Sequence, residues 1–459
     1  MPVSAASSYK INQAELALAI KQLAEFVAIP SVSNPNSPDY NLKHIKSAAD
    51  FTAKRLEELG FKVRQVKIGD SAPYVLAEKI VNASKPTLLL YAHYDVQPVD
   101  RSKWQSDPFV LTERDGRLYG RGASDDKGGI IGIITALGTY QRAYGVLPVN
   151  IKILFEGEEE YGSNHMSALV KQEAARLKAD ALVILDGGNA GLNTGTLTNS
   201  TRGLVNLQLE VKAMEKPIHS GVGCIAPDPA AVLAELMTML RDPKKIPGFM
   251  DDCTPLKSME REYLQKSSQT AESYASEHGL VKGAQLRGDP NVSVYERIAE
   301  EPSISFVNGG WGVQNGGNSI QDSARCQIGV RLTPGQNPDR IAKVLIQYLT
   351  SRKVPYGLEV KATLSQAGSF AWKGDLSRPL SQKYLAALGD HFQDTHVQPT
   401  GGALPFLYDF QKAFPNMEMI IPGVEDPKCA AHSHNESQDI GLFERAINAM
   451  IAFFKKAGS

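Results

Sequence analysis

Two stretches near the start of the chain show apolar residues at the spacing of an amphipathic helix. The first covers residues 14–27, and the second runs from Ile45 to Leu59 and stops at Gly60. Glycine readily adopts the left-handed conformation that ends many helices, so we expect the chain to turn there into a strand over residues 61–68. The pattern predicts two helices followed by a strand.

Short apolar runs then alternate with helical stretches. Residues 87–91, 149–155 and 181–185 are mostly aliphatic, which is typical of buried strands in a parallel sheet. Helices are expected between these strands, over residues 127–140 and 163–177. This alternation indicates an α/β domain with a mainly parallel sheet.

The pattern changes after Asp186. Residues 187–203 are rich in Gly, Asn and Thr, so we expect a linker and a domain boundary there. Residues 204–211 include a true alternation of apolar and polar positions, which favours an antiparallel strand with one exposed face. Residues 241–297 are polar and irregularly patterned, and predict inserted helices and loops. The other expected elements of this α+β domain are residues 229–240, 303–307, 326–332, 338–349 and 358–364.

The first pattern returns from about residue 374. A helix is expected from Pro379, a strand over residues 417–421 and a closing helix over residues 440–456. The sequence therefore predicts one α/β domain that a smaller, two-layer α+β domain interrupts. The expected boundaries are 1–200 and 371–459 for the α/β domain and 201–370 for the α+β domain.

Composition narrows the class of protein. The chain has 459 residues, too many for one ordinary core, and a net charge of -1, which does not favour nucleic acid as a partner. No apolar run approaches the ~18 residues that span a bilayer, and the N-terminal segment does not resemble a secretion signal. The four cysteines are widely separated and form no CxxC pair. We expect a cytoplasmic enzyme that acts on a small molecule.

Acidic residues and histidines gather where the predicted strands end. Ligands bind beyond the carboxyl ends of the strands in open α/β sheets, so these side chains are candidates for one site. Asp125 and Asp126 form a further cluster in a glycine-rich turn before the helix at residues 127–140. The candidates that follow or precede strands are His93, Asp95, Glu158, Glu159, Glu160, Asp186, His432 and His434.

Gathering so many carboxylates would cost roughly several kcal/mol for each uncompensated charge. A pair of bound metal ions removes that cost. Imidazole and carboxylate ligands suit Zn²⁺, with Mn²⁺ or Co²⁺ as alternatives. His93 could bind a metal through one ring nitrogen, while Asp95 holds the site in register without binding the metal. Each cluster alone is more typical of an ordinary surface, and only the whole set in this chain order favours a metal centre.

The motifs resemble those of the di-zinc metallopeptidase family that includes carnosinases, cytosolic non-specific dipeptidases, glutamate carboxypeptidases, aminoacylases and succinyl-diaminopimelate desuccinylases. The resemblance covers nearly the whole chain. It implies hydrolysis of a peptide bond in dipeptides or at a C-terminal residue, and it implies that the smaller domain serves as a lid and in dimerisation. The motifs are YAHYDVQP, YGRGASDDKGG, FEGEEEYGS, ILDGGN, KPIHSGV, GVRLTPG and AAHSHNES.

The resemblance also implies roles for residues at two metal ions per chain. Asp125 would bridge both ions, His93 and Asp186 would complete one, and Glu160 and His432 the other. Alignment of the family's EEYGS with this chain makes Glu159 the general base for a metal-bridging water and leaves Glu158 without a role. Asp95 would support the same site.

Substrate-binding roles follow from the same resemblance. His219 would reach into the active site of a partner subunit and stabilise the developing oxyanion, which implies a homodimer. Arg331 would bind the terminal carboxylate of a small peptide, because a guanidinium can donate two parallel hydrogen bonds. Asn318 would assist it, and Gly401 and Gly402 would offer backbone N–H groups.

Two positions depart from the family pattern. Many relatives have a glutamate and a serine where this chain has Thr400 and Ala403, which bears on substrate preference, and His434 has no assigned role. The main alternative function is an N-acyl amino acid deacylase or desuccinylase with the same metals. A binding protein on an inactive scaffold is disfavoured, because every metal position carries a competent ligand. A nucleotide-binding enzyme is disfavoured because GRGASDDKGG lacks the order of a phosphate loop.

Overall fold

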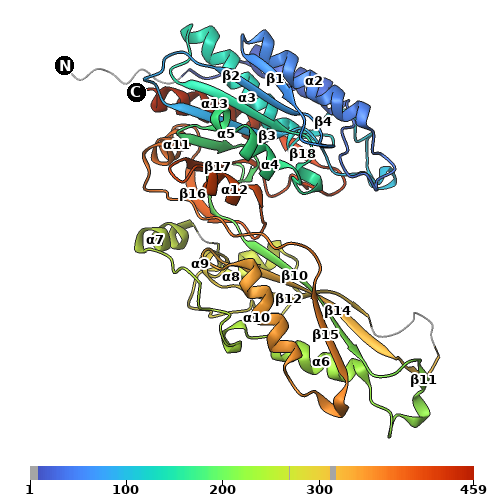
Figure 1. Ribbon diagram of the computed structural model, residues 1–459. Coiled ribbons are helices and arrows are strands. Elements are labelled where there is room, and N and C mark those ends of the chain that lie inside the picture. Colours follow the sequence, from blue (N-terminus) through green and yellow to red (C-terminus); the bar gives the residue numbers. More distant parts are fainter. Residues whose placement is uncertain (1–8, 268, 311–316) are drawn as a thin grey trace. The chain divides into compact units, whose positions relative to one another are not determined.

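The computed structural model describes residues 9–267, 269–310 and 317–459, and these residues form two compact units. Unit 1 contains the described residues up to Asn199, together with Gly374–Gln398 and Asp409–Ser459. Unit 2 contains Ser200–Lys373 and Pro399–Tyr408. Figure 1 follows the chain by colour from unit 1 into unit 2 and back into unit 1. The smaller unit is thus inserted into the larger one along the sequence.

Unit 1 is built on a nine-stranded sheet whose centre is parallel. The central strands β6, β3, β7 and β17 are aligned, so their carboxyl ends lie at one edge. Antiparallel strands flank them, and this mainly parallel sheet confirms the predicted fold class. The order is β1 (Lys62–Val66), β2 (Tyr74–Lys79), β6 (Asn150–Glu156), β3 (Thr87–His93), β7 (Ala181–Ile184), β17 (Glu418–Glu425), β9 (Thr194–Ser200) and β16 (Asp394–Pro399), with β8 (Gly187–Gly188) paired to β17.

Helices of unit 1 pack on this sheet and on one another, as Figure 1 shows. Helix α3 is the most central: its first fourteen residues, from Lys127 to Tyr140, are all buried. The expected stop of α2 at Gly60 is confirmed, since this glycine has φ +78°. The helices are α1 (Gln13–Val27), α2 (Leu42–Glu58), α3 (Lys127–Tyr144), α4 (Met166–Gln172), α5 (Ala174–Leu177), α11 (Pro379–Gly389) and α13 (Ile440–Ala457). Helix α12 (Phe406–Ala413) starts in unit 2 and continues into unit 1 from Asp409. A small sheet joins β4 (Thr112–Arg114), β5 (Arg117–Tyr119) and β18 (Ser437–Asp439).

Two expectations for unit 1 are wrong. The segment at residues 187–203 is no linker, because it contains β8 and β9. Small polar residues of this segment are buried instead of exposed. Thr196 N donates to Asn189 Oδ1, and Thr196 Oγ1 accepts from Ala190 N. Asn189 Nδ2 donates to Glu425 O. The single helix expected over residues 163–177 is two helices, starting only at Met166, because Ser163 has a left-handed φ of 48°.

Unit 2 is a two-layer α+β structure, as its alternating pattern predicts. Strand β10 alternates between buried and partly exposed residues along its whole length and pairs with β14 and β15 in an antiparallel sheet. The buried side chains of the sheet and of helices α6 and α10 form one apolar core. The sheet order is β12 (Ser303–Gly310), β14 (Ser323–Leu332), β10 (Gly203–Lys212) and β15 (Glu359–Leu364), and the two helices are α6 (Pro229–Met239) and α10 (Pro338–Thr350).

The polar stretch at residues 241–297 forms short helices and loops, as expected. Pro399–Tyr408 differs from expectation because it belongs to unit 2: Thr400 N donates to Ser200 O, and the Tyr408 ring stacks on Phe370 with centroids 3.8 Å apart. None of the helices described is long and apolar enough to cross a membrane. The remaining elements of unit 2 are α7 (Ser258–Ser267), α8 (Ala271–Glu277), α9 (Val294–Glu300), β11 (Ile218–His219) and β13 (Ser319–Ile320).

Candidate metal centre

Five predicted metal ligands converge in unit 1. Three come directly from the parallel strands, because β3 ends at His93, β6 precedes the short 3-10 helix at Glu159–Tyr161, and β7 is followed by Asp186. Asp125 comes from the turn that enters α3, and His432 comes from the segment after β17. The aligned carboxyl ends of the strands therefore explain why residues far apart in sequence meet.

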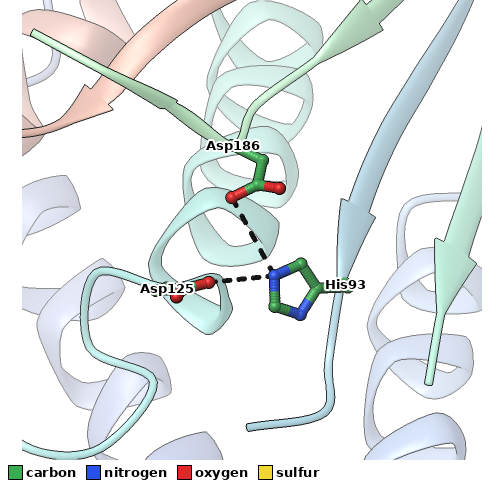
Figure 2. Close-up of side chains that lie close together, drawn as sticks. All are labelled: His93, Asp125 and Asp186. Atoms are coloured by element: carbon green, nitrogen blue, oxygen red, sulfur yellow. Dashed lines mark ion pairs between the residues drawn. The ribbon is translucent and has the colours of Figure 1, made fainter. Parts of the chain in front are cut away.

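One group of donors consists of His93, Asp125 and Asp186, shown in Figure 2. His93 Nε2 lies 2.9 Å from Asp125 Oδ1 and 3.9 Å from Asp186 Oδ1. All three side chains are largely buried, and one ligand atom from each lies within 4.8 Å of the others. Such spacing fits a single divalent cation between one imidazole and two carboxylates.

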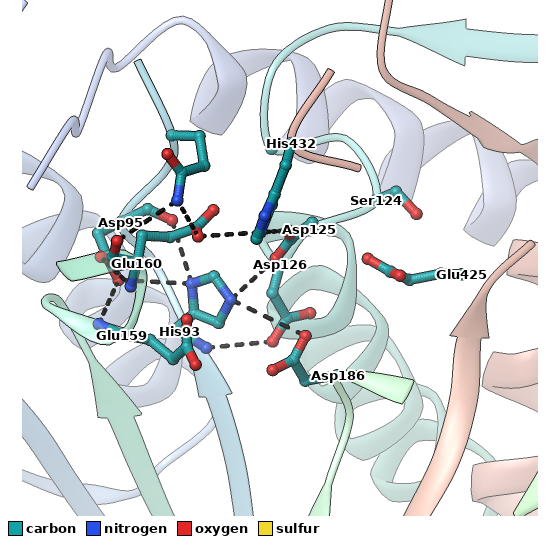
Figure 3. Close-up of polar contacts among 12 residues, drawn as sticks. His93, Asp95, Ser124, Asp125, Asp126, Glu159, Glu160, Asp186, Glu425 and His432 are labelled. Carbon is teal, nitrogen blue, oxygen red and sulfur yellow. Dashed lines mark hydrogen bonds and ion pairs between the residues drawn. The ribbon is translucent and has the colours of Figure 1, made fainter. Parts of the chain in front are cut away.

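A second group uses the other oxygen of the same aspartate. His432 Nε2 lies 2.9 Å from Asp125 Oδ2 and 3.0 Å from Glu160 Oε2. Figure 3 shows both groups around Asp125, whose two oxygens face opposite histidines. The arrangement fits two cations that share one bridging carboxylate.

Asp95 connects this cluster to its supporting loop. Its backbone oxygen lies 3.1 Å from His93 Nδ1, and its carboxylate accepts from Glu159 N at 3.2 Å and Glu160 N at 3.0 Å (Figure 3). A contact at the far ring nitrogen fixes the orientation of a metal-binding imidazole. Asp95 thus holds both the histidine and the acidic loop, without being part of either donor group.

The charges of the cluster fit bound cations. Burial raises the pKa of Asp186 and of Glu160, and repulsion from Asp125 adds to both shifts. Hydrogen bonds to Asp125 and Glu160 raise the pKa of His432 to about 11. Burial acts to raise the pKa of Asp125, but hydrogen bonds from the two histidines outweigh it and hold that pKa below its usual range. Divalent cations would relieve the repulsion that these carboxylates exert on one another.

The three consecutive glutamates have different surroundings. Glu160 belongs to the second donor group, whereas Glu158 accepts from Tyr74 Oη at 2.7 Å and contacts His165 Nδ1 at 3.0 Å. Glu159 is in neither donor group; burial raises its pKa to about 7. This division supports the assignment of Glu159 and Glu160 over Glu158, which is a structural anchor.

Sequence reasoning gave Asp126 no role and did not single out Glu436, two buried carboxylates beside the cluster. Asp126 Oδ2 accepts from the backbone N of His93 at 3.1 Å, and a Cβ at Gly129 would lie 2.0 Å from its other oxygen. Glu436 bonds to the loop that carries Asp125. Asp126 belongs to the motif DDKGG and Glu436 to the motif AAHSHNES. Membership of these motifs was the sequence signal that could have pointed to them.

The substrate-binding candidates lie in unit 2 at two places. His219 and Asn318 are exposed on the ribbon of β11 and β13, where Ser220 N donates to Asn318 O at 2.8 Å. His219 Nδ1 accepts from Gly221 N at 3.0 Å. His434, in unit 1, is also exposed, and its Nδ1 lies 3.5 Å from Ser433 Oγ.

Arg331 and Gly401 line a cavity of about 500 Å³. Arg331 is half-buried, and burial lowers the pKa of its guanidinium. The Gly402 N–H, however, donates to Thr400 Oγ1 at 3.2 Å, and the Gly402 carbonyl accepts from Arg202 N at 2.8 Å. The Gly402 N–H is thus bonded to the threonine hydroxyl, and its role in binding a substrate carboxylate stays a prediction.

An α/β sheet with mixed imidazole and carboxylate donors at its carboxyl edge is typical of a metal-dependent hydrolase. Residues 89–456 match the model of peptidase family M20/M25/M40. The chain is 31% identical to a cysteinylglycine-S-conjugate dipeptidase of Corynebacterium striatum, over 95% of each chain. It is 29% identical to the human Beta-Ala-His dipeptidase, over 95% of this chain and 89% of that protein.

Solved structures of peptidases are also similar to this chain. An M20 family metallo-carboxypeptidase from Sulfolobus solfataricus has a TM-score of 0.81 and 25% identity, and covers 98% of this chain and 100% of its own. Human carnosine dipeptidase 1 has a TM-score of 0.78 and 26% identity, over 97% of each chain. The chain belongs to peptidase family M20/M25/M40. It is a metal-dependent peptidase.

Proposed function

We propose that this protein is a dipeptidase that holds two Zn²⁺ ions per chain and cleaves the peptide bond next to a free carboxylate. The observation that carries the proposal is the pair of donor groups that share Asp125. The relatives that are named dipeptidases match nearly the whole chain, which supports the same class of substrate here. Carboxypeptidase action on longer peptides is a second candidate, favoured by the likeness to the metallo-carboxypeptidase.

The metal roles follow the geometry of the two groups. His93 and Asp186 would hold one ion, Glu160 and His432 the other, and Asp125 both. When bound, the two ions would supply an acidified water and polarise the scissile carbonyl. Zn²⁺ is proposed because these ligands include imidazole and no thiolate.

Glu159 would act as the general base. Its carboxyl belongs to neither donor group, although its neighbour Glu160 belongs to the second, so it is available beside the ions to take a proton and release it again. The proton from the attacking water would pass through Glu159 to the leaving nitrogen. Asp95 would keep this loop in place through its bonds to two backbone N–H groups.

Arg331 would bind the terminal carboxylate. No hydrogen bond or ion pair of its guanidinium is found among the described residues, and the side chain lines a cavity large enough for a small ligand group. Gly401 lines the same cavity. A guanidinium donates two parallel hydrogen bonds to a carboxylate, which favours substrates with a free C-terminus.

His219 would donate a hydrogen bond to the oxyanion of a partner subunit's substrate. Since its Nδ1 accepts from the Gly221 N–H, the neutral ring carries its proton on Nε2, which makes the outward nitrogen a donor. The exposed apolar side chains of Val222 and Ile225 nearby favour a protein partner, so a homodimer is proposed. Asn318 would assist on the same ribbon. A cytoplasmic location is proposed from the sequence alone.

A substrate panel with metal analysis tests the proposal. Protein loaded with Zn²⁺ is expected to contain two ions per chain and to hydrolyse dipeptides faster than tripeptides, N-acetyl amino acids or N-succinyl amino acids. Chelation should abolish this activity, and Zn²⁺ should restore it. Preference for the acylated amino acids would instead favour the deacylase alternative, and preference for longer peptides would favour a carboxypeptidase.

A further inference from the structure

Glu436 occupies an unusual place beside the metal centre. It lies four residues after His432, just before β18, and its side chain is completely buried. It belongs to neither donor group. A buried carboxylate that binds no metal needs hydrogen-bond donors around it.

Four donors surround this carboxylate, and all belong to the glycine-rich turn before α3. Oε2 accepts from Arg121 Nη1 at 2.6 Å and from Gly122 N at 2.9 Å. Oε1 accepts from Ser124 N and from Asp125 N, each at 3.0 Å. Each carboxylate oxygen therefore accepts from two donors, Oε2 from Arg121 and Gly122 and Oε1 from Ser124 and Asp125.

These bonds join two segments that supply metal ligands. Glu436 is fixed to the His432 segment by the chain, and its carboxylate holds the backbone of Asp125 directly. Two further bonds reinforce the connection: Gly120 N donates to Glu436 O at 3.0 Å, and Arg121 Nη2 donates to Ser433 O at 3.0 Å. Among these contacts, only the Glu436 carboxylate bonds directly to the backbone of the shared aspartate.

We propose that Glu436 is a positioning residue for the dinuclear centre, which sets the backbone at Asp125 so that its two oxygens reach both histidines. The proposal rests on the proposed two-metal function. Glu436 itself would contact neither metal nor substrate. It acts through Asp125, so its loss should weaken metal binding more than it lowers the stability of unit 1.

Glu436→Gln is the sharpest test, because the side chain keeps its shape and loses one acceptor. Whichever way the amide is turned, its NH₂ group faces a pair of donors that a carboxylate oxygen accepted. Calorimetric titration of the metal-free protein with Zn²⁺ should show about 10- to 100-fold weaker binding of at least one ion, the usual effect of removing a residue that supports a metal ligand. Glu436→Asp keeps the charge but cannot reach all four donors, so it should lie between parent and Glu436→Gln.

Glu418→Gln is the matched control. Glu418 is also a buried carboxylate of unit 1, and it accepts from Leu380 N at 3.2 Å, Ser381 N at 2.8 Å and Ser381 Oγ at 3.0 Å at the start of α11, on the opposite end of β17. It should lower the melting temperature without changing Zn²⁺ affinity. A merely structural role for Glu436 would give the same result.

The outcomes separate the two proposals. If the parent protein binds fewer than two Zn²⁺ ions, the proposed function fails. If the parent binds two ions and Glu436→Gln binds them with equal affinity, only the positioning role is overturned. Should Glu436→Gln not fold, Glu436→Asp carries the test, and parental affinity in that variant overturns the role.

Discussion

The two units differ in how their candidate residues are held. In unit 1 the candidate metal ligands lie close to one another, and Asp95 and Glu436 fix their loops by hydrogen bonds. In unit 2 the candidates are divided between an exposed ribbon with His219 and a cavity with Arg331. Unit 1 thus carries a site that is organised before substrate arrives, whereas unit 2 offers separate polar groups that only a ligand or a partner would engage.

Because of this difference, we expect substitutions in the two units to cause different defects. Changes in unit 1 should alter metal content, because each carboxylate there compensates charge in a common cluster. Changes in unit 2 should leave the metal content at the parental value and alter catalysis or substrate affinity alone. Variants of both units, compared by metal analysis and kinetics, test the division.

Asp125→Asn should have the largest effect. The amide offers one oxygen and no charge, so neither donor group keeps its shared ligand, and activity should fall by at least about 10³-fold as several kcal/mol of metal-dependent stabilisation are lost. Metal analysis should find both ions depleted. Asp186→Asn, which affects one group only, should retain one ion; two tightly bound ions in Asp125→Asn would contradict the bridging role.

Glu159→Gln should come next. Loss of the general base should lower kcat by about 10²- to 10⁴-fold, while both ions stay bound because Glu159 is in neither donor group. Glu160→Gln is the matched comparison, since it should lose metal as well as activity. A Glu159→Gln protein with parental kcat would remove the proposed base.

His219→Ala should lower kcat by about 10²-fold, the usual effect of losing one oxyanion donor, with unchanged metal content. A mixing experiment asks whether the donor comes from another subunit. Equal amounts of His219→Ala and Glu159→Gln chains, unfolded and refolded together, should recover about a quarter of parental activity if mixed dimers contain one complete site. No recovery, with mixed dimers demonstrated by mass, would mean that His219 does not act across subunits.

Arg331→Met should have the smallest effect of the four. KM for dipeptides should rise about 10- to 100-fold, because a charge-assisted hydrogen bond contributes about 1.5–3 kcal/mol, and C-terminal amides should be unaffected. The control is Arg325→Met on the same strand, whose side chain is 61% exposed and paired with Glu210 at 2.7 Å. Equal KM changes in the two variants would argue against a carboxylate site at Arg331.

The elements that the sequence predicted well are those whose burial shows in the pattern. Strand β10 alternates at every position, and the buried strands β3, β6 and β7 consist of aliphatic runs. Strand β9 was missed because its polar residues Thr196, Thr198 and Asn199 are buried, and contacts such as that of Thr196 N with Asn189 Oδ1 arise only in the tertiary structure. Composition alone cannot distinguish such a strand from a loop.

The candidate site divides in the same way. The convergence of the candidate metal ligands could be predicted, because the parallel sheet brings the strand ends together. Glu436 could not, since its role depends on four backbone and side-chain donors from a turn more than three hundred residues earlier. The hydrogen bond from Gly402 N to the Thr400 hydroxyl could not be predicted either, because no sequence pattern indicates this local contact. The metal and substrate roles themselves stay predictions until the variants are measured.

The order of the ligands along the chain has a consequence for biosynthesis. Strand β17 and His432 emerge from the ribosome only after the whole of unit 2 has been made, so a nascent chain carries at most His93, Asp125, Glu160 and Asp186. Until then the central sheet lacks a strand and the second donor group lacks its imidazole. A nascent chain that stops short of His432 would therefore lack the second of the two proposed metal sites.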